Sequence, residues 1–215
     1  MANISSWVAD VSSRVPGASK TEIEAAIRAI IREFCSKTLL YLRQLTAINI
    51  VDGTATYTLA APVDTAIVTV ERVEISGIPI SPTSMDYLDR SMDDWRSLES
   101  ETPLEYMVDV ERVLRFKETP TENITGGLVV WVSLKPSPTT STVPDFIYDD
   151  WYETILNGVI SHLMRMPGKS WTNLQGSEYF DDYYHSTLGD AKAKKFTGKT
   201  KISLRVQSPP FNVVG

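Results

Sequence analysis

Cysteine and long apolar runs are scarce in this sequence. Cys35 is the single cysteine among 215 residues, which excludes a disulfide within the chain and favours a reducing cytoplasm. No apolar run approaches the roughly 20 residues of a transmembrane helix. Residues 1–7 lack the basic and apolar regions of a secretory signal. We therefore expect no membrane contact, and we expect Cys35 to be a small buried residue within a helix.

Motifs that carry enzyme chemistry are also missing. The sequence has no His-Glu-x-x-His, no paired Cys-x-x-Cys and no Gly-x-Ser-x-Gly, the spacings typical of zinc sites and serine nucleophiles. His162 and His185 lie in helical patterns, and neither has a second His, Cys or carboxylate at metal-ligand spacing on its own helix face that would give a closed site. The pair Gly126-Gly127 precedes a strand rather than a helix, so it does not form a phosphate-binding loop. The sequence predicts a protein that is not an enzyme and has no catalytic residue, cofactor or metal.

An acidic group offers an alternative, a cation site. Its members are Asp86, Asp89, Asp93 and Asp94. The group lacks the glycine and the terminal glutamate of a calcium-binding loop, and its spacing fits the exposed face of a short amphipathic helix. We therefore interpret it as a solvated helix face.

Helical periodicity occurs at both ends of the chain. Residues 144–166 and 172–196 predict two helices joined by a turn at Pro167-Gly168, with Thr172 as the cap of the second helix. Residues 4–15 predict a short first helix. A longer helix should follow to about Tyr41, starting from a capping box of Ser19 and Glu22.

The middle of the chain changes to the alternation of strands. Asp52-Gly53 lies between two β-rich runs and predicts a hairpin. Residues 66–75 predict a strand that turns at Ser76-Gly77, and residues 84–95 predict a short helix inserted among the strands. Further strands are expected at residues 106–109, 113–116 and 128–134.

This order predicts an α+β fold. The N-terminal and C-terminal helices form a helical bundle, with an antiparallel β subdomain inserted between them and an extended C-terminal arm. The expected parts are residues 1–43 (N-terminal helices), 44–135 (inserted β subdomain), 136–196 (C-terminal helical hairpin) and 197–215 (extended basic arm).

Positive charge gathers in the last part of the chain. Residues 191–215 hold six basic residues and no acidic one, so the net charge of −6 divides into +6 for this tail and −12 for residues 1–190. Residues 201–206 alternate strictly between polar and apolar side chains before Pro209-Pro210. The tail is either a solvated terminus or an arm that orders on a partner, by adding a strand to a sheet edge or by pairing with an acidic surface. Contacts of its lysines with nucleic-acid phosphates are a further possibility, although the acidic body argues against DNA as the main ligand.

Several stretches carry a family resemblance. They are Glu-Phe-Cys-Ser-Lys-Thr at residues 33–38, Leu-Lys-Pro-Ser at 134–137, Asn-Gly-Val-Ile-Ser-His-Leu at 157–163 and Met-Pro-Gly-Lys-Ser-Trp at 166–171. Together they resemble the head-to-tail adaptor (connector) proteins of tailed bacteriophages, over about residues 15–196. The resemblance implies a structural virion protein at the head–tail junction, assembled in the host cytoplasm.

The resemblance also implies partners. Adaptors of this family form a homo-oligomeric ring, commonly a dodecamer, below the portal protein. The ring extends the DNA channel, supports the tail or nozzle proteins, and lets genomic DNA pass during ejection without sequence-specific binding. The C-terminal arm would bind the portal, and the residues expected to do so are Lys195, Lys199, Lys201, Ile202, Leu204, Arg205, Val206 and Phe211.

Another class of function remains open on the residues alone. The β subdomain could be a binding module for a glycan or a protein surface, with the helices as scaffold. Its contacts would be exposed aromatic side chains of that subdomain, and the candidates are Tyr57, Tyr87 and Trp95. An enzyme with an unrecognised site is the third possibility.

Overall fold

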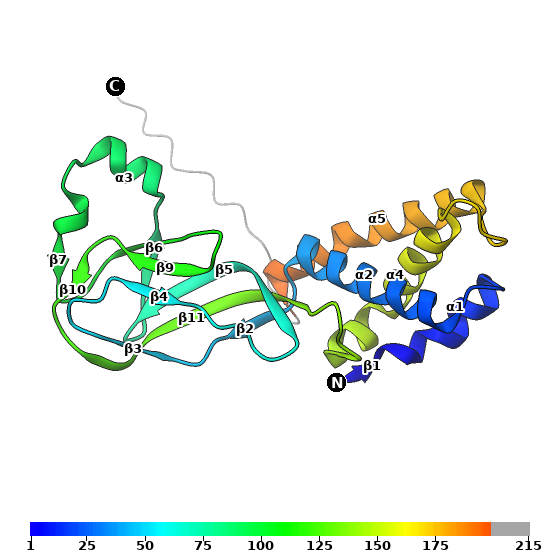
Figure 1. Cartoon of the computed structure of the whole chain (residues 1–215), viewed down its shortest axis with the longest axis horizontal. Helices are drawn as coiled ribbons and strands as arrows, with labels where there is room; N and C mark the ends of the chain where they lie inside the picture. Colours follow the sequence, from blue (N-terminus) through cyan, green and yellow to red (C-terminus); the bar gives the residue numbers. More distant parts are fainter. Residues whose placement is uncertain (199–215) are drawn as a thin grey trace, which may run out of the picture.

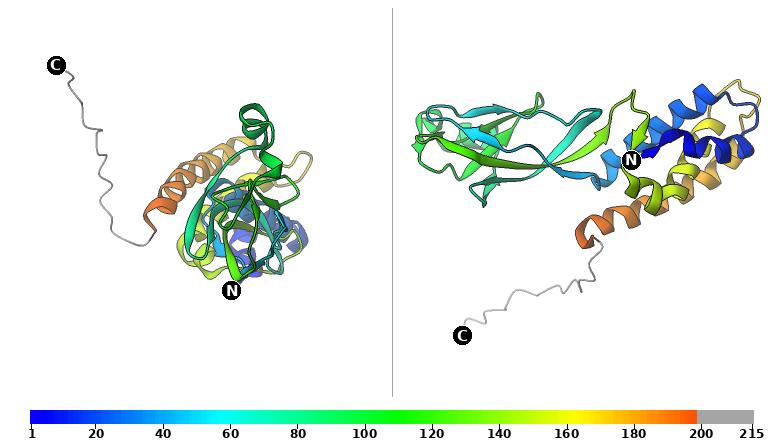
Figure 2. Two further views of the ribbon diagram at one scale, coloured as in Figure 1. Left: turned by 90° about the vertical axis from the view of Figure 1, so that its left-hand side faces the viewer. Right: turned by 90° about the horizontal axis from the view of Figure 1, so that it is seen from below.

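The chain forms an elongated α+β structure with a helical half and a β half (Figure 1). The structure is a computed structural model and describes residues 1–198. The two halves lie end to end along the long axis (Figure 2). No helix within the described residues is long and apolar enough to cross a membrane.

Both ends of the chain contribute to the helical half. Its elements are a 3₁₀ turn η1 (Ile4–Trp7) and the helices α1 (Val8–Arg14), α2 (Lys20–Thr38), α4 (Asp145–Met164) and α5 (Leu174–Thr197). Helix α4 packs against both α2 and α5. The first strand, β1 (Ala2–Asn3), pairs with β12 (Thr142–Val143) and holds the N-terminus beside the start of α4.

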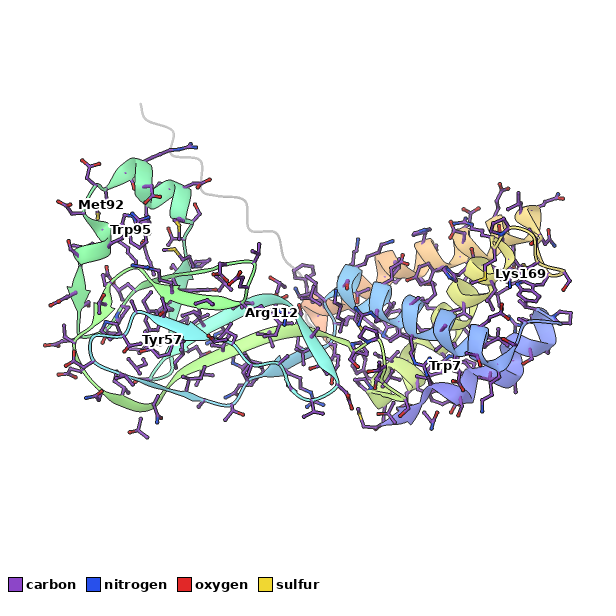
Figure 3. The ribbon with its side chains drawn as sticks, in the orientation of Figure 1. Trp7, Tyr57, Met92, Trp95, Arg112 and Lys169 are labelled. Atoms are coloured by element: carbon purple, nitrogen blue, oxygen red, sulfur yellow. The ribbon has the colours of Figure 1, made fainter. Side chains whose placement is uncertain are left out.

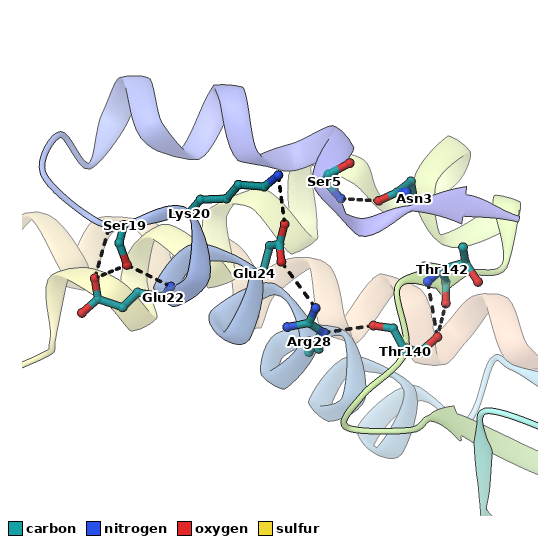
Figure 4. Close-up of polar contacts among 9 residues, drawn as sticks. All are labelled: Asn3, Ser5, Ser19, Lys20, Glu22, Glu24, Arg28, Thr140 and Thr142. Atoms are coloured by element: carbon teal, nitrogen blue, oxygen red, sulfur yellow. Dashed lines mark hydrogen bonds and ion pairs between the residues drawn. The ribbon is translucent and has the colours of Figure 1, made fainter.

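Helix α2 begins as the sequence predicts. Ser19 accepts a hydrogen bond from the backbone N–H of Glu22, and the Glu22 carboxylate accepts one from the backbone N–H of Ser19 (Figure 4). This capping box satisfies two backbone donors that a helix start leaves free. The helix ends at Thr38 rather than near Tyr41, because Leu39 takes a left-handed conformation (φ 56°) that stops helical hydrogen bonding.

Helix α5 has a different cap from the predicted one. The Asn173 side chain accepts a hydrogen bond from the Gly176 N–H, whereas the Thr172 hydroxyl donates to the Met166 carbonyl and so closes the turn after α4. An asparagine placed directly before the helix caps it better than a threonine one residue earlier.

The β half is built around a curled mixed sheet. The strands follow the order β2-β11-β5-β6-β8-β9-β4, and β3 also pairs with β11. The bounds of these strands are β2 Leu42–Gln44, β3 Ile48–Ile50, β4 Thr56–Thr58, β5 Thr65–Ile75, β6 Ile78–Pro82, β8 Glu105–Val108, β9 Val113–Phe116 and β11 Ile124–Pro136. A separate pair joins β7 (Glu99–Ser100) to β10 (Thr119–Pro120).

The predicted hairpin at Asp52-Gly53 is wrong. The turn exists, but β3 pairs with β11 and β4 pairs with β9, so the two flanking strands do not pair with each other. The backbone N–H of Gly53 donates to the Pro120 carbonyl, and that of Asp52 donates to the Asn123 side chain. These contacts hold the turn against the loop before β11. The turn predicted at Ser76-Gly77 is confirmed, and β5 and β6 pair antiparallel across it.

The inserted helix is shorter than predicted. Helix α3 (Met85–Ser91) starts from Ser84 as its N-cap, and a separate 3₁₀ turn η2 (Trp95–Ser97) follows it. Both stand at the end of the β half remote from the other helices (Figure 1). Leu88, Trp95 and Met107 form a small core of their own there. The main core is a single cluster that continues from the helical half into the β half.

Candidate interaction surface

Lys195 is the only predicted partner-binding residue that the structure describes. The other seven, Lys199, Lys201, Ile202, Leu204, Arg205, Val206 and Phe211, lie outside the described residues. Lys195 is in the last turn of α5, and its Nζ lies 2.8 Å from Oε2 of Glu71 on β5. The ammonium is thus held within the chain, where it joins the end of the helical half to the sheet.

Glu71 occupies a special position in β5. The register of β5 against β11 shifts between Val70 and Arg72, so Glu71 is the extra residue of a β-bulge, a feature that re-aims a side chain. Its Oε1 atom is buried without a hydrogen-bond partner among the described residues. The pKa of the Tyr106 phenol is raised, mainly by burial and also by the negative charge of Glu71. A carboxylate with one free oxygen therefore lies beside the point where α5 ends.

Aromatic side chains surround the end of α5. Helix α4 is distorted at Trp151 (φ −129°, ψ 19°), and Nζ of Lys194 lies 5.1 Å from the centre of the Trp151 ring, a cation–π contact. Phe196 is 76 % exposed. Trp151, Lys194 and Phe196 line an open, largely apolar hollow. This surface therefore combines an exposed aromatic ring, a buried one and a cation.

Several titratable groups elsewhere have structural partners. Asp89 accepts hydrogen bonds from Nε1 of Trp95 and from Arg96, and these contacts, chiefly that with Arg96, lower the pKa of its carboxyl. His185 lies 3.6 Å from Asp181, which also pairs with Arg165. Burial raises the pKa of the Cys35 thiol to about 12, so it is protonated at neutral pH. Within residues 1–198 there is no group of three or more metal-ligating side chains.

Two of the three aromatic residues proposed for a glycan site are buried. Trp95 lies in the small core under α3, and the guanidinium groups of Arg96 and Arg115 both make cation–π contacts with its ring. Tyr57 packs against Phe116 inside the β half, and Figure 3 shows both residues in these places. Only Tyr87 is exposed. The predicted contact set is therefore wrong, because alternation identifies an aromatic strand residue without showing which of its neighbours cover it.

Sequence reasoning overlooked Glu71 and Trp151 as parts of this surface. A signal for the bulge was present, since the apolar positions of β5 shift phase between Val70 and Val73. No comparable signal marks Trp151, because its place in this surface depends on its contact with Lys194, which lies 43 residues further along the chain near the end of α5.

The described residues define an α+β protein with an exposed surface at the end of α5. The sequence model of the SU10 adaptor protein family matches residues 1–203. The chain belongs to this family and is a bacteriophage adaptor, a virion component that interacts with other head and tail proteins. Such structural adaptors are generally not enzymes. No curated protein matches the chain.

Proposed function

We propose that this adaptor forms a homo-oligomeric ring of twelve copies below the portal, extends the DNA channel and carries the tail. Family membership supports the adaptor role. The observation that supports the ring is that helices from both ends of the chain pack against one another, α4 against α2 and α5; in this proposal they act as one bundle, with the β half inserted between them. The proposal includes the division of the chain into four parts, with boundaries after residues 43, 135 and 196.

The contact between copies would use the outer face of α5. Two large aromatic side chains four residues apart are exposed on one face of this helix, Tyr179 by 72 % and Tyr183 by 45 %. A ring needs a heterologous contact, in which this face of one copy meets a different face of the next. Tyrosine is well suited to such a contact, because its ring is apolar and its hydroxyl tolerates water.

The charge distribution suits passage of DNA. Residues 1–190 carry a net charge of −12, and twelve such bodies around a channel would repel the phosphates of the genome. The DNA would then slide through without sequence-specific binding. The basic tail would act elsewhere, on the portal.

Attachment to the portal would use the C-terminal arm. Lys199, Lys201 and Arg205 would pair with acidic groups of the portal, while Ile202, Leu204, Val206 and Phe211 would supply apolar contacts. Lys195 would keep the base of the arm in place through its ion pair with Glu71.

Electron microscopy of the protein mixed with portal rings tests this function. We expect added density with twelvefold symmetry below the portal. Introducing charge at the proposed contact, with Tyr179→Glu and Tyr183→Glu together, should prevent ring growth while the monomer stays folded. Tyr87→Glu is the matched control, because the exposure of Tyr87 (63 %) lies between those of Tyr179 and Tyr183 but the residue is on α3. Rings that form normally from the double variant would contradict the proposed contact.

A further inference from the structure

The sheet has a gap the width of one strand, beyond the end of β6. Strand β6 lies between β5 and β8, pairing with Val73–Ile75 on one side and with Glu105 and Tyr106 on the other. It ends at Pro82, where the chain leaves the sheet toward α3 (Figure 1). Both neighbours continue, β5 back to Thr65 and β8 on to Val108. Since adjacent strands lie about 4.8 Å apart, β5 and β8 flank a space of about 10 Å there.

This space, which we call the β6 gap, is not filled by side chains and forms a cavity in the surface. Its volume is about 430 Å³, and it is lined by residues 67–70 of β5, residues 82–83, residues 106–110 and Arg112. Figure 3 places Arg112 where the β half meets the helical half. The gap therefore opens toward the end of α5.

The backbone along one wall of the gap is unpaired. Residues 66–70 of β5 pair with β11 on their other side, and within residues 1–198 no backbone hydrogen bond joins them to a strand across the gap. An open strand edge of this kind is a template for an added strand. The free Oε1 of Glu71 lies near the inner end of the gap, next to Tyr106, and can accept further hydrogen bonds.

The position of α5 indicates the occupant. Lys195 contacts Glu71 at 2.8 Å, and α5 ends at Thr197, so residues 198–200 can span the roughly 10 Å that a three-residue extended segment covers. The next six residues, 201–206, alternate Lys-Ile-Ser-Leu-Arg-Val. This is the pattern of a strand with one apolar and one polar face.

We propose that the β6 gap is a strand-acceptor site and that residues 201–206 of the same chain occupy it in the free protein. A strand that continues the direction of β6 runs antiparallel to β5 and parallel to β8. Ile202, Leu204 and Val206 then share one face, beside Ile67, Tyr106 and Val108 of the main core. Lys201, at the start of the segment, is then close to Glu71.

Hydrogen exchange of the full-length protein, without portal, tests the proposal. We expect the amides of residues 201–206 and the gap-facing amides of residues 66–70 to exchange at least about tenfold more slowly than in an open chain. Replacing Ser203 and Leu204 together by proline removes two N–H donors and should abolish both protections. Val213→Pro is the control, because it lies beyond the segment, and it should leave them unchanged. Equal exchange in the wild type and the double-proline variant would overturn the proposal.

Crosslinking identifies which copy supplies the strand. Cysteine at Thr69 is combined with cysteine at residue 202, 203 or 204 in separate variants, which allows for each register. We expect oxidation to give a disulfide within one chain in at least one variant, with the protein remaining monomeric. A disulfide formed only between two chains would overturn the assignment to the same chain. No portal or ring is present in these two experiments. A negative result would therefore overturn the strand-acceptor site only, and the proposed adaptor ring would still be tested separately by electron microscopy.

Discussion

Glu22 shows how one side chain can connect distant parts of the helical half. Its carboxylate binds Nζ of Lys169 at 2.8 Å, in the turn between α4 and α5, while it also closes the capping box of α2. Figure 3 places Lys169 at the end of the helical half farthest from the sheet. The hydrogen bond from Lys169, followed by those from Ser19, lowers the pKa of Glu22 from 4.5 to about 2.

This lowered pKa predicts a specific dependence on pH. The unfolded chain binds a proton at Glu22 at a higher pH than the folded chain does, so the stabilisation is complete above about pH 4.5 and is lost as the pH falls toward 2. Glu22→Gln should therefore flatten the decline of unfolding free energy over this interval, as measured by urea titrations at successive pH values. Glu178→Gln serves as control, since Glu178 is exposed and has no ion pair to residues 1–198 in the structure. The prediction fails if both variants show the same slope as the wild type.

At the scale of elements, the crossing of three helices depends on Gly158. A β-carbon built at this position would lie 2.9 Å from Cγ2 of Ile30 on α2 and 2.9 Å from Cδ2 of Tyr184 on α5. Real side chains almost never approach so closely. The missing side chain of Gly158 thus lets α4 pack closely against both neighbours.

Gly158→Ala should consequently destabilise the protein. Overpacking costs about 1–3 kcal/mol, which exceeds the roughly 1 kcal/mol that alanine gains over glycine in a helix. Gly189→Ala is the matched control, because Gly189 lies in α5 with no atom within 4 Å of the added carbon; it should stabilise the protein by about 0.5–1 kcal/mol. Thermal unfolding of the two variants checks the opposite signs. If Gly158→Ala stabilised the protein, the result would show that α2 and α5 can move away from α4 to make room for the added methyl group.

Local signals predicted the elements better than their pairing. The capping box at Ser19 and the turn at Ser76-Gly77 involve neighbouring residues only, and both are confirmed. Strand β3 pairs with β11 and strand β4 pairs with β9, and these partners lie far along the chain. The Asp52-Gly53 turn therefore gave a wrong prediction of which strands pair. The ion pair of Lys195 with Glu71 spans 124 residues, and no local pattern identifies such a partner.

At the scale of the whole molecule, the C-terminal arm cannot bind the portal and occupy the β6 gap at the same time. The portal contact and the β6 gap would use the same residues, 201–206, so the arm would have to leave its own sheet before it could bind the portal. Free adaptors would keep their strand edges covered, which limits unwanted pairing between copies. The portal would then compete with an intramolecular site, and attachment would require both a portal and a released arm.

A reversible lock tests this competition. The Thr69→Cys variant whose second cysteine forms the disulfide within one chain should fail to join portal rings when oxidised and should join them after reduction. Cys35 does not interfere, because it is buried and its thiol remains protonated at neutral pH. The single variant Thr69→Cys, treated with the same oxidant and reductant, controls for both reagents and should bind the portal throughout. Binding of the oxidised, locked protein at the level of the reduced one would show that the portal recognises a surface other than the arm. In that event the exposed apolar hollow formed by Trp151 and Phe196 at the end of α5 would be the next surface to change.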